Sequence, residues 1–265
     1  MLKMLLPAMI LCIVFSCSEE PSENERVVRI ATDWRNRSQG VEVPPQYSLK
    51  TGELHLHGIS EETYTIPHIF QPGRHSIYVY NPASNISIDG TTASVEVENG
   101  FMKALPGWFF TFAHHITIEE GKDYTISAVM QQQIGELNFV LLSPKSFAKQ
   151  VSRIQGSLNG VASQLDIPSG ELIGQPISVM LDFTKDSDST FVASTRIAGI
   201  IGNVQLLNCR IVFKDDSLPV ALKMSDLHYV LEDFNADKLS SRIVSIELIP
   251  EEEGLRAIKP ATASE

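Results

Sequence analysis

Short runs of alternating apolar and polar residues, separated by turn-forming residues, are the feature that most constrains the fold of this chain. Residues 53–57, 75–80 and 94–98 alternate in this way, and Gly, Pro, Asn or Asp interrupts the pattern between them. Such runs are typical of strands that place one face on a core. Asp89-Gly90 lies between residues 86–88 and 94–98 and is the strongest hairpin signal in the chain. The pattern predicts antiparallel β-sheets.

The runs fall into two series along the 265 residues. Each series holds roughly seven strands at about ten-residue spacing, which is the pattern of a β-sandwich. We therefore predict an all-β chain with two tandem antiparallel β-sandwich domains, spanning residues 27–128 and 129–250. A length of this order also suits two domains.

Three segments near the second domain carry separate predictions. Residues 146–154 place Phe147, Val151 and Ile154 at helical spacing, which predicts a short helix. Strand-like runs at residues 227–234 and 243–249 are expected to close the domain. The polar residues 251–265 are predicted to form a disordered tail.

The N-terminus has the pattern of a secretory signal. Lys3 precedes an apolar run from Leu5 to Phe15, which is too short to cross a bilayer as a helix because that takes about 20 residues. The run ends in Ser16-Cys17, similar to the lipobox of bacterial lipoproteins. This resemblance predicts a lipoprotein signal peptide at residues 1–16, with Cys17 as the lipidated first mature residue. An ordinary signal peptide with an incidental cysteine is the alternative.

Residues 17–26 read as an acidic tether between this anchor and the first domain. Within it, Ser18-Glu19-Glu20 is similar to the short acidic signal that sends Bacteroidetes lipoproteins to the outer face of the outer membrane. A solvated linker is the equally weighted alternative.

Charge and cysteine content narrow the class of protein further. The formal net charge is −11, and removal of Lys3 with the signal leaves 20 basic and 32 acidic residues, a net charge of −12. This balance argues against nucleic acid and anionic lipid surfaces as partners. With Cys12 removed and Cys17 lipidated, Cys209 remains, in a strand-like run at residues 204–213. We expect a buried structural thiol there.

No sequence pattern for catalysis, a cofactor or a metal emerges. The chain contains no Gly-x-Ser-x-Gly, no His-Glu-x-x-His and no phosphate-binding glycine loop. His55 and His57 share one face of a strand and form a conceivable metal pair, but a solvent-facing pair is the simpler interpretation. Asp186 and Asp188 lack the rest of a calcium loop and are expected in a solvated turn. We therefore predict a chain that is not an enzyme.

Aromatic residues offer one alternative binding chemistry. Trp108, Phe109, Phe110 and Phe112 form a run that either stacks on sugar rings or, more simply, belongs to a strand buried on both sides. Trp34 is expected in a core or at a sheet edge.

The order of several motifs resembles the Bacteroidetes fimbrial assembly and anchor lipoproteins of the FimB type, which are related to the fimbrillins. The motifs run in this order: Ser16-Cys17, Asp33-Trp34, Phe70-Gln-Pro-Gly73, Tyr78-Val-Tyr-Asn81, Met130-Gln-Gln-Gln, Gly156-Ser-Leu-Asn-Gly-Val-Ala162 and Leu165-Asp-Ile-Pro-Ser-Gly170. They span nearly the whole mature chain.

The resemblance implies two transthyretin-like β-sandwiches, a place on the cell surface in a fimbrium, and no catalysis. It implies a fimbrial anchor or assembly subunit held in the outer membrane by palmitate-type acylation of Cys17, with fimbrial shaft subunits as partners. Shaft subunits of such fimbriae polymerise by strand donation after cleavage at an arginine, and Arg26, Arg29, Arg35 and Arg37 lie in the corresponding region. Two alternatives stay open: a glycan-binding lipoprotein of an outer-membrane sugar importer, and a shaft or tip fimbrillin.

Overall fold

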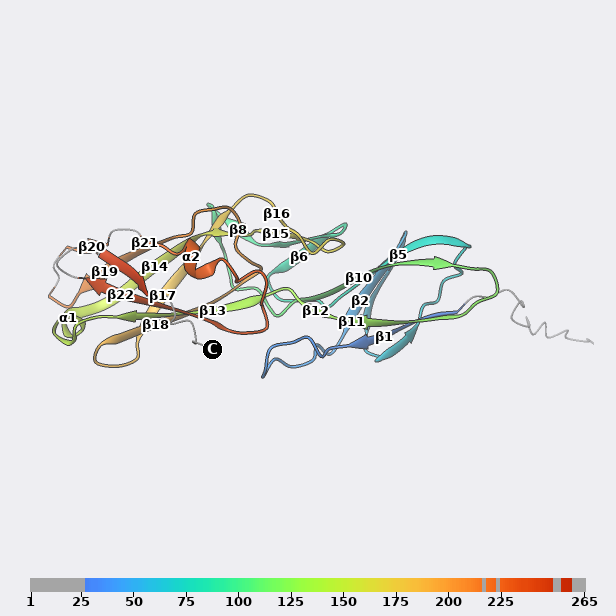
Figure 1. The fold of residues 1–265 in the computed structure, drawn as a ribbon, viewed down its shortest axis with the longest axis horizontal. Helices are drawn as coiled ribbons and strands as arrows, with labels where there is room; N and C mark the ends of the chain where they lie inside the picture. The colour runs from blue at the N-terminus through green and yellow to red at the C-terminus, as the bar shows by residue number, and fades with distance from the viewer. Residues whose placement is uncertain (1–26, 216–217, 223–224, 250–253, 259–265) are drawn as a thin grey trace, which may run out of the picture.

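The structure, a computed structural model, describes residues 27–215, 218–222, 225–249 and 254–258. Strands form nearly all of its regular structure, and the described helices are the short α1 (Lys145–Gln150) and α2 (His228–Leu231). The predicted all-β class is therefore confirmed. The molecule is elongated, and the described chain begins at one tip of the long axis, whereas β19, β20 and α1 lie at the other (Figure 1).

The half of the molecule that contains the beginning of the described chain is built from two sheets. One sheet has the order β11-β1-β4 and the other β12-β10-β5-β2-β3. Their strands are β1 (Val28–Asp33), β2 (Tyr47–Thr51), β3 (Leu54–Ile59), β4 (Thr63–Thr65), β5 (Gly73–Tyr80), β10 (Phe110–Ile118), β11 (Tyr124–Val129) and β12 (Gln131–Gln132). Strand β1 shows why the alternation matters: Val28, Ile30 and Thr32 are buried, and the residues between them are only partly so. The buried side chains of the two sheets meet in one apolar core.

The second half is a larger two-layered structure. One layer contains β20, β19, β14 and β17, the other contains β18, β13, β22 and β23, and β17 connects them by its hairpin with β18. The strands are β13 (Gly135–Leu142), β14 (Val151–Val161), β17 (Ile177–Lys185), β18 (Thr190–Ile197), β19 (Leu206–Phe213), β20 (Val220–Ala221), β21 (Ser225–Asp226), β22 (Arg242–Ile249) and β23 (Gly254–Ile258). Alternate residues of these strands form the largest apolar core of the described chain.

A segment of the predicted first domain pairs with the second half. The segment forms the predicted hairpin of β6 (Ile86–Asp89) and β7 (Thr92–Val95), and then β8 (Val97–Glu98) and β9 (Phe101–Met102). Strand β7 pairs with β15 (Gln164–Asp166), which also pairs with β16 (Leu172–Ile173), and β9 pairs with β17. The division at residue 129 stays a prediction, since these pairings cross it.

Not every strand pair is antiparallel as predicted. Strand β1 runs parallel to β11, β13 runs parallel to β22, and β9 runs parallel to β17. A parallel neighbour cannot be reached through a tight turn, so the chain must cross over before it returns. In each half the opening strand therefore lies beside a strand from the end of that half.

Three local predictions need correction. The short helix predicted within residues 146–154 is present as α1 but ends at Gln150, and Val151 and Ile154 are buried residues of β14. Residues 227–234, predicted as a strand, contain α2. The predicted disordered tail includes β23, which pairs with β22 over five residues and so covers an edge that would otherwise have unpaired backbone groups. The remaining tail residues, 251–253 and 259–265, lie outside the described chain.

Candidate functional site: a cavity beside Trp34

Cys17, the predicted lipid attachment site, lies outside the described residues, and its lipidation stays a prediction. Within the described part of the chain, no helix has the length and apolar character needed to span a membrane.

Cys209 is a buried thiol in β19, as predicted. Its side chain lies in the core of the second half, and 4% of the residue is exposed. Burial raises the pKa of the thiol to about 12, because the interior disfavours the thiolate. A thiol in this setting is protonated and shielded from reagents, which fits a structural role.

His55 and His57 share the outer face of β3, as predicted, with their ring centroids 3.9 Å apart. His55 Nε2 lies 2.6 Å from the Tyr80 hydroxyl, and His57 Nδ1 lies 3.2 Å from Ser48 Oγ. Burial, followed by the neighbouring His57, lowers the pKa of His55. Among the described residues, no group of three or more His, Cys, Asp or Glu side chains is arranged to hold a metal ion.

The aromatic run at residues 108–112 faces two different cores. Phe110 belongs to the core of the first half, and Phe109 packs in a separate cluster between β7, β15 and their neighbours. Arg196 lies over the Trp108 ring, 5.4 Å from its centroid. The strand itself begins at Phe110, so Trp108 and Phe109 precede it, and the rings of the run pack against these two cores, fully for Phe109 and Phe110 and partly for Trp108 and Phe112.

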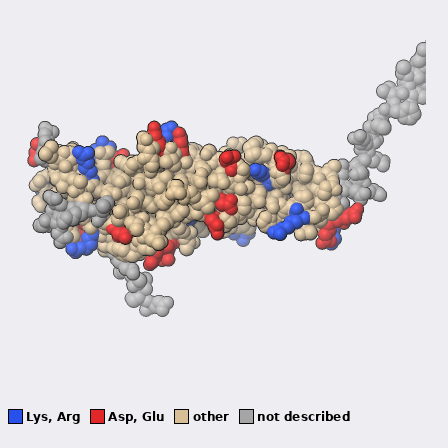
Figure 2. All heavy atoms as spheres, turned by 90° about the horizontal axis from the view of Figure 1, so that it is seen from above, with Lys and Arg blue, Asp and Glu red and all other residues tan. Residues whose placement is uncertain are grey.

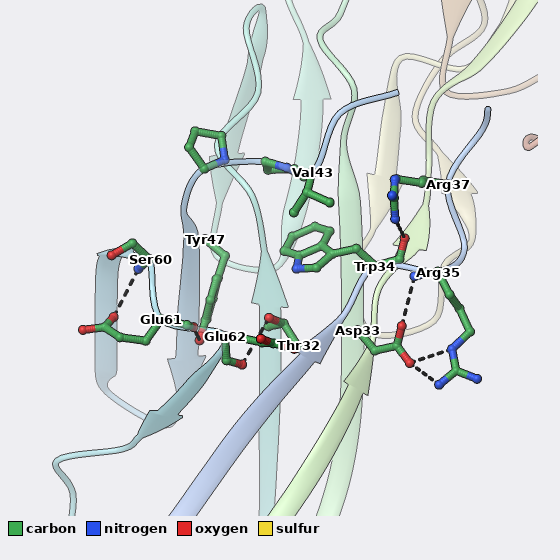
Figure 3. A pocket seen from close by; sticks show the side chains of 12 residues that line it. Thr32, Asp33, Trp34, Arg35, Arg37, Val43, Tyr47, Ser60, Glu61 and Glu62 are labelled. Carbon is green, nitrogen blue, oxygen red and sulfur yellow. Dashed lines mark hydrogen bonds and ion pairs between the residues drawn. The ribbon is translucent and has the colours of Figure 1, made fainter. Parts of the chain in front are cut away.

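A cavity of about 600 Å³ lies at the end of β1 (Figure 3). Three segments that are distant in sequence meet there: the end of β1 with the loop after it, the approach to β2, and the turn between β3 and β4. The lining residues are Thr32, Asp33, Trp34, Arg35, Arg37, Val43, Pro44, Pro45, Tyr47, Ser60, Glu61 and Glu62.

Trp34 is held in place on two sides. Its ring packs edge-on against Phe110, with centroids 5.6 Å apart. Arg37 donates from Nη1 to the Trp34 carbonyl at 2.6 Å and from Nε to the Val41 carbonyl at 3.1 Å, which fixes the loop after β1. The indole N–H has no hydrogen-bond acceptor within the described chain. Figure 3 shows the indole beneath Val43, with its nitrogen turned to the side of the cavity where Tyr47 lies.

The charged side chains around the cavity differ in whether they have bonding partners within the described chain. Arg35 donates from Nε to Asp33 Oδ2 at 2.6 Å, and this bond lowers the pKa of the Asp33 carboxyl. The Tyr47 hydroxyl donates to the Glu61 carbonyl at 3.0 Å, and burial, with a smaller contribution from Glu61, raises its pKa to about 12. Within the described chain, the carboxylates of Glu61 and Glu62 form no ion pair. Arg35 is thus paired with a carboxylate and Arg37 is held by backbone carbonyls, whereas within the described chain Glu61 Oε2 accepts only the Ser60 N–H, at 3.2 Å, and the Glu62 carboxylate has no hydrogen-bond partner.

Sequence reasoning identified Trp34 but missed the cavity around it. Trp34 is half-buried against the core of the first half, which agrees with the sheet-edge interpretation. Tyr47, Glu61 and Glu62 were not singled out, because no local spacing links them to Trp34. The β-pairing of β1 with β4 and of β2 with β3 brings them together.

A second cavity, of about 420 Å³, lies in the other half and is lined in part by Lys238. Burial lowers the pKa of Lys238 to about 8. Perturbed titratable groups in cavities are candidate functional residues. The Glu171 carboxylate lies in the same lining, which disfavours an anionic ligand there.

Fold and site together define an elongated, all-β protein with a ligand-sized cavity in the half where the described chain begins. No protein-family model matches the chain, and no curated protein sequence matches it. Solved structures do match. A candidate adhesin from Bacteroides ovatus aligns with a TM-score of 0.64 at 15% identity, covering 98% of this chain and 100% of that one.

Two further structures share the fold over most of their length. The fimbrial anchor protein Mfa2 from Porphyromonas gingivalis aligns with a TM-score of 0.58 at 9% identity, over 88% of this chain and 95% of that one. A candidate polysaccharide-binding protein from Bacteroides thetaiotaomicron aligns with a TM-score of 0.56 at 7% identity, over 85% and 92%. The chain therefore has the fold of Bacteroidetes fimbrial-type proteins, as the motif order predicted.

Proposed function

We propose that this protein is a non-catalytic adhesion protein of the bacterial cell surface that serves as a fimbrial anchor or assembly subunit, tethered through lipidated Cys17. Shaft subunits of the fimbrium are its partners, and the outer membrane holds its lipid. The fold shared with the anchor Mfa2 supports this proposal. The lipobox at Ser16-Cys17 supports the tether.

The observation that carries the proposal is the position of β1. The described chain begins at one tip of the long axis and enters β1 directly, so a tether at this end leaves the opposite tip farthest from the membrane (Figure 1). Strand β1 pairs with β11 from Val28 to Asp33 and with β4 on its other edge. Pulling on the tether therefore loads a strand that is hydrogen-bonded on both sides.

An intact β1 also distinguishes this chain from a shaft subunit that has been cleaved at an arginine. Cleavage at Arg35 or Arg37 would cut the chain after β1, so β1 and the lipid at Cys17 would no longer be covalently joined to the rest. At the other end, Gly254–Ile258 is already paired with β22 and is not a spare donor strand. Both features favour a chain that accepts or terminates a fimbrium over one that polymerises.

The distribution of charge argues against nucleic acid as a partner. Acidic and basic side chains are interspersed on the face drawn in Figure 2, and broad areas carry neither. A protein that binds nucleic acid would need a basic stripe or patch. The net charge of −11 points away from such partners.

The cavity beside Trp34 favours a second candidate, a surface glycan-binding lipoprotein of an outer-membrane sugar uptake system. It has the concave form and mixed lining that small-molecule sites require. The two candidates differ in their partner, a protein subunit or a sugar.

Replacing Cys17 with alanine is expected to release the protein from the membrane or to leave its precursor unprocessed. A single lipid chain gives only marginal attachment, so the wild type needs more than one chain on Cys17. Detergent-phase partitioning of wild type and variant measures this, with Cys209→Ala as the matched cysteine control. Unchanged partitioning of the Cys17→Ala variant would show that the anchor lies elsewhere.

Incubation with shaft subunits tests the partner. The mature chain carrying Cys17→Ala should stay monomeric alone and should bind one end of a shaft subunit, as measured by light scattering and crosslinking. We expect this because both of its terminal strands in the described chain, β1 and β23, are paired internally. Self-assembly into long filaments would contradict the anchor proposal and favour a shaft fimbrillin.

A further inference from the structure

The cavity beside Trp34 combines apolar walls with hydrogen-bonding groups that the described chain leaves unused. We infer that this cavity binds a neutral carbohydrate ring, with Trp34 as its main contact residue. The inference does not depend on membrane attachment or on a fimbrial partner, because every residue it uses lies in the half that begins with β1.

The size and the apolar lining fit a sugar. About 600 Å³ lies within the range of roughly 300–1,000 Å³ typical of small-molecule sites. Pro44, Pro45 and the half-exposed Val43 line the cavity together with the indole of Trp34. Aromatic faces and pyrrolidine rings present the flat apolar surface against which the C–H face of a pyranose packs. The contact of Trp34 with Phe110 holds that surface in place before any ligand arrives.

The polar groups discriminate between ligand classes. The cavity offers the indole N–H of Trp34 as a donor, the carboxylate of Glu62, which has no hydrogen-bond partner in the described chain, and the carboxylate of Glu61, whose Oε2 accepts only the Ser60 N–H at 3.2 Å. A sugar hydroxyl both donates and accepts, so adjacent hydroxyls satisfy both kinds of group. A buried polar group that loses water without gaining a partner costs about 1–3 kcal/mol. A ligand must therefore offer an acceptor to the indole N–H and donors to the carboxylates.

Charged ligands fit less well. An acidic sugar would meet the carboxylates of Glu61 and Glu62, and Arg35 is paired with Asp33, so Arg37 is the one lining cation without an ion pair in the described chain and the lining as a whole stays negative. A lysine or arginine side chain of a peptide would satisfy the carboxylates but itself has no acceptor for the indole N–H, which would need a backbone carbonyl of the peptide at the right place. A neutral polyol is the ligand class that leaves none of these groups unpaired.

The test uses the mature chain from residue 17, with Cys17→Ala so that no lipid is attached. The chain has two tryptophans, so a Trp108→Phe background makes Trp34 the sole fluorescent reporter. Glucose, galactose, mannose, N-acetylglucosamine and their short neutral oligomers are titrated into the millimolar range. At least one should shift the Trp34 emission, and saturation-transfer NMR on the chain with Trp108 intact should detect the same sugar.

Variants then assign the contacts. Trp34→Phe keeps a ring but removes the N–H, and Glu62→Gln keeps the size but removes the charge; each should weaken binding roughly five- to tenfold. Glu98→Gln, an exposed change on β8 in the other half, is the matched control and should have no effect. Binding should not change between 50 and 500 mM salt, since no charge is neutralised.

Two results would overturn the inference. In one, no sugar in the panel produces both a Trp34 emission shift and a saturation-transfer signal, or the saturation-transfer NMR shows that Trp34→Phe binds the sugar as tightly as the protein with Trp34. In the other, a lysine-rich peptide binds with an affinity that falls with salt and no sugar competes with it, which would make the cavity a site for basic peptides. Neither result bears on membrane release by Cys17→Ala, so the two proposals fail separately.

Discussion

Replacing Ile30 with alanine is expected to lower the free energy of unfolding of the first half by about 2–5 kcal/mol. Ile30 is fully buried at the middle of β1, where it faces the core and its backbone pairs with Ile126 on one side and Tyr64 on the other. Truncation leaves a cavity that strands tied on both edges cannot collapse to fill. Urea unfolding in the Trp108→Phe background, followed by Trp34 fluorescence, measures the loss, because Trp34 packs on the same core.

The same substitution at an exposed isoleucine separates the effect of burial from the effect of the residue type. Ile69 is 58% exposed, so Ile69→Ala should change the free energy of unfolding by no more than about 0.5 kcal/mol. Equal effects of Ile30→Ala and Ile69→Ala would mean that β1 is not a buried central strand. The anchor proposal would then lose its mechanical basis, since the tether leads straight into β1.

The strands that sequence reasoning located best are those with one buried face. Residues 86–98 show this: the alternating runs on either side of Asp89-Gly90 form the β6–β7 hairpin, and Gly90 has the positive φ of +61° that this turn requires. Alternation is a local signal. It is reliable here because successive residues of such a strand face the core and the solvent in turn along its whole length.

The two wrong secondary-structure predictions near the end of the chain have different causes. Leu227, Val230, Leu231 and Phe234 are all buried, and their i, i+3, i+4, i+7 spacing is the helical pattern that α2 realises. The strand predicted for residues 227–234 does not take this spacing into account. Strand β23 failed for the opposite reason, because its backbone pairing with β22 overrides a weak intrinsic preference.

The cavity could not be predicted from the sequence, because strand pairing brings its lining residues together. Trp34 and Glu62 are 28 positions apart, and no periodicity connects them. They meet because β1 takes β4 as its antiparallel neighbour, which places the turn before β4 beside the end of β1: the Thr32 N–H donates to the Glu62 carbonyl at 2.9 Å. A site assembled by strand pairing becomes visible only when the pairing is known.

The stability conferred by Cys209 is expected to decline at high pH. Burial raises the pKa of its thiol from 9.0 to about 12, so folding favours the protonated form. This contribution is complete below pH 9, the unfolded value, and is lost progressively as the pH rises from 9 towards 12. One pKa unit corresponds to about 1.4 kcal/mol, so the advantage of wild type over Cys209→Ala should shrink by about 1.4 kcal/mol between pH 8 and pH 10.

The difference between wild type and Cys209→Ala is the quantity to measure, because Tyr47 also has a raised pKa, about 12, and titrates in both proteins alike. Urea midpoints at the two pH values provide it. Thiol labelling gives an independent reading: with 4% of Cys209 exposed, the folded protein should react slowly at pH 8 and rapidly once unfolded. A difference that stays constant from pH 8 to 10, or fast labelling of the folded protein, would mean that solvent reaches the thiol. Cys209 would then be a reactive group on the surface of the second half and no longer a core residue of β19.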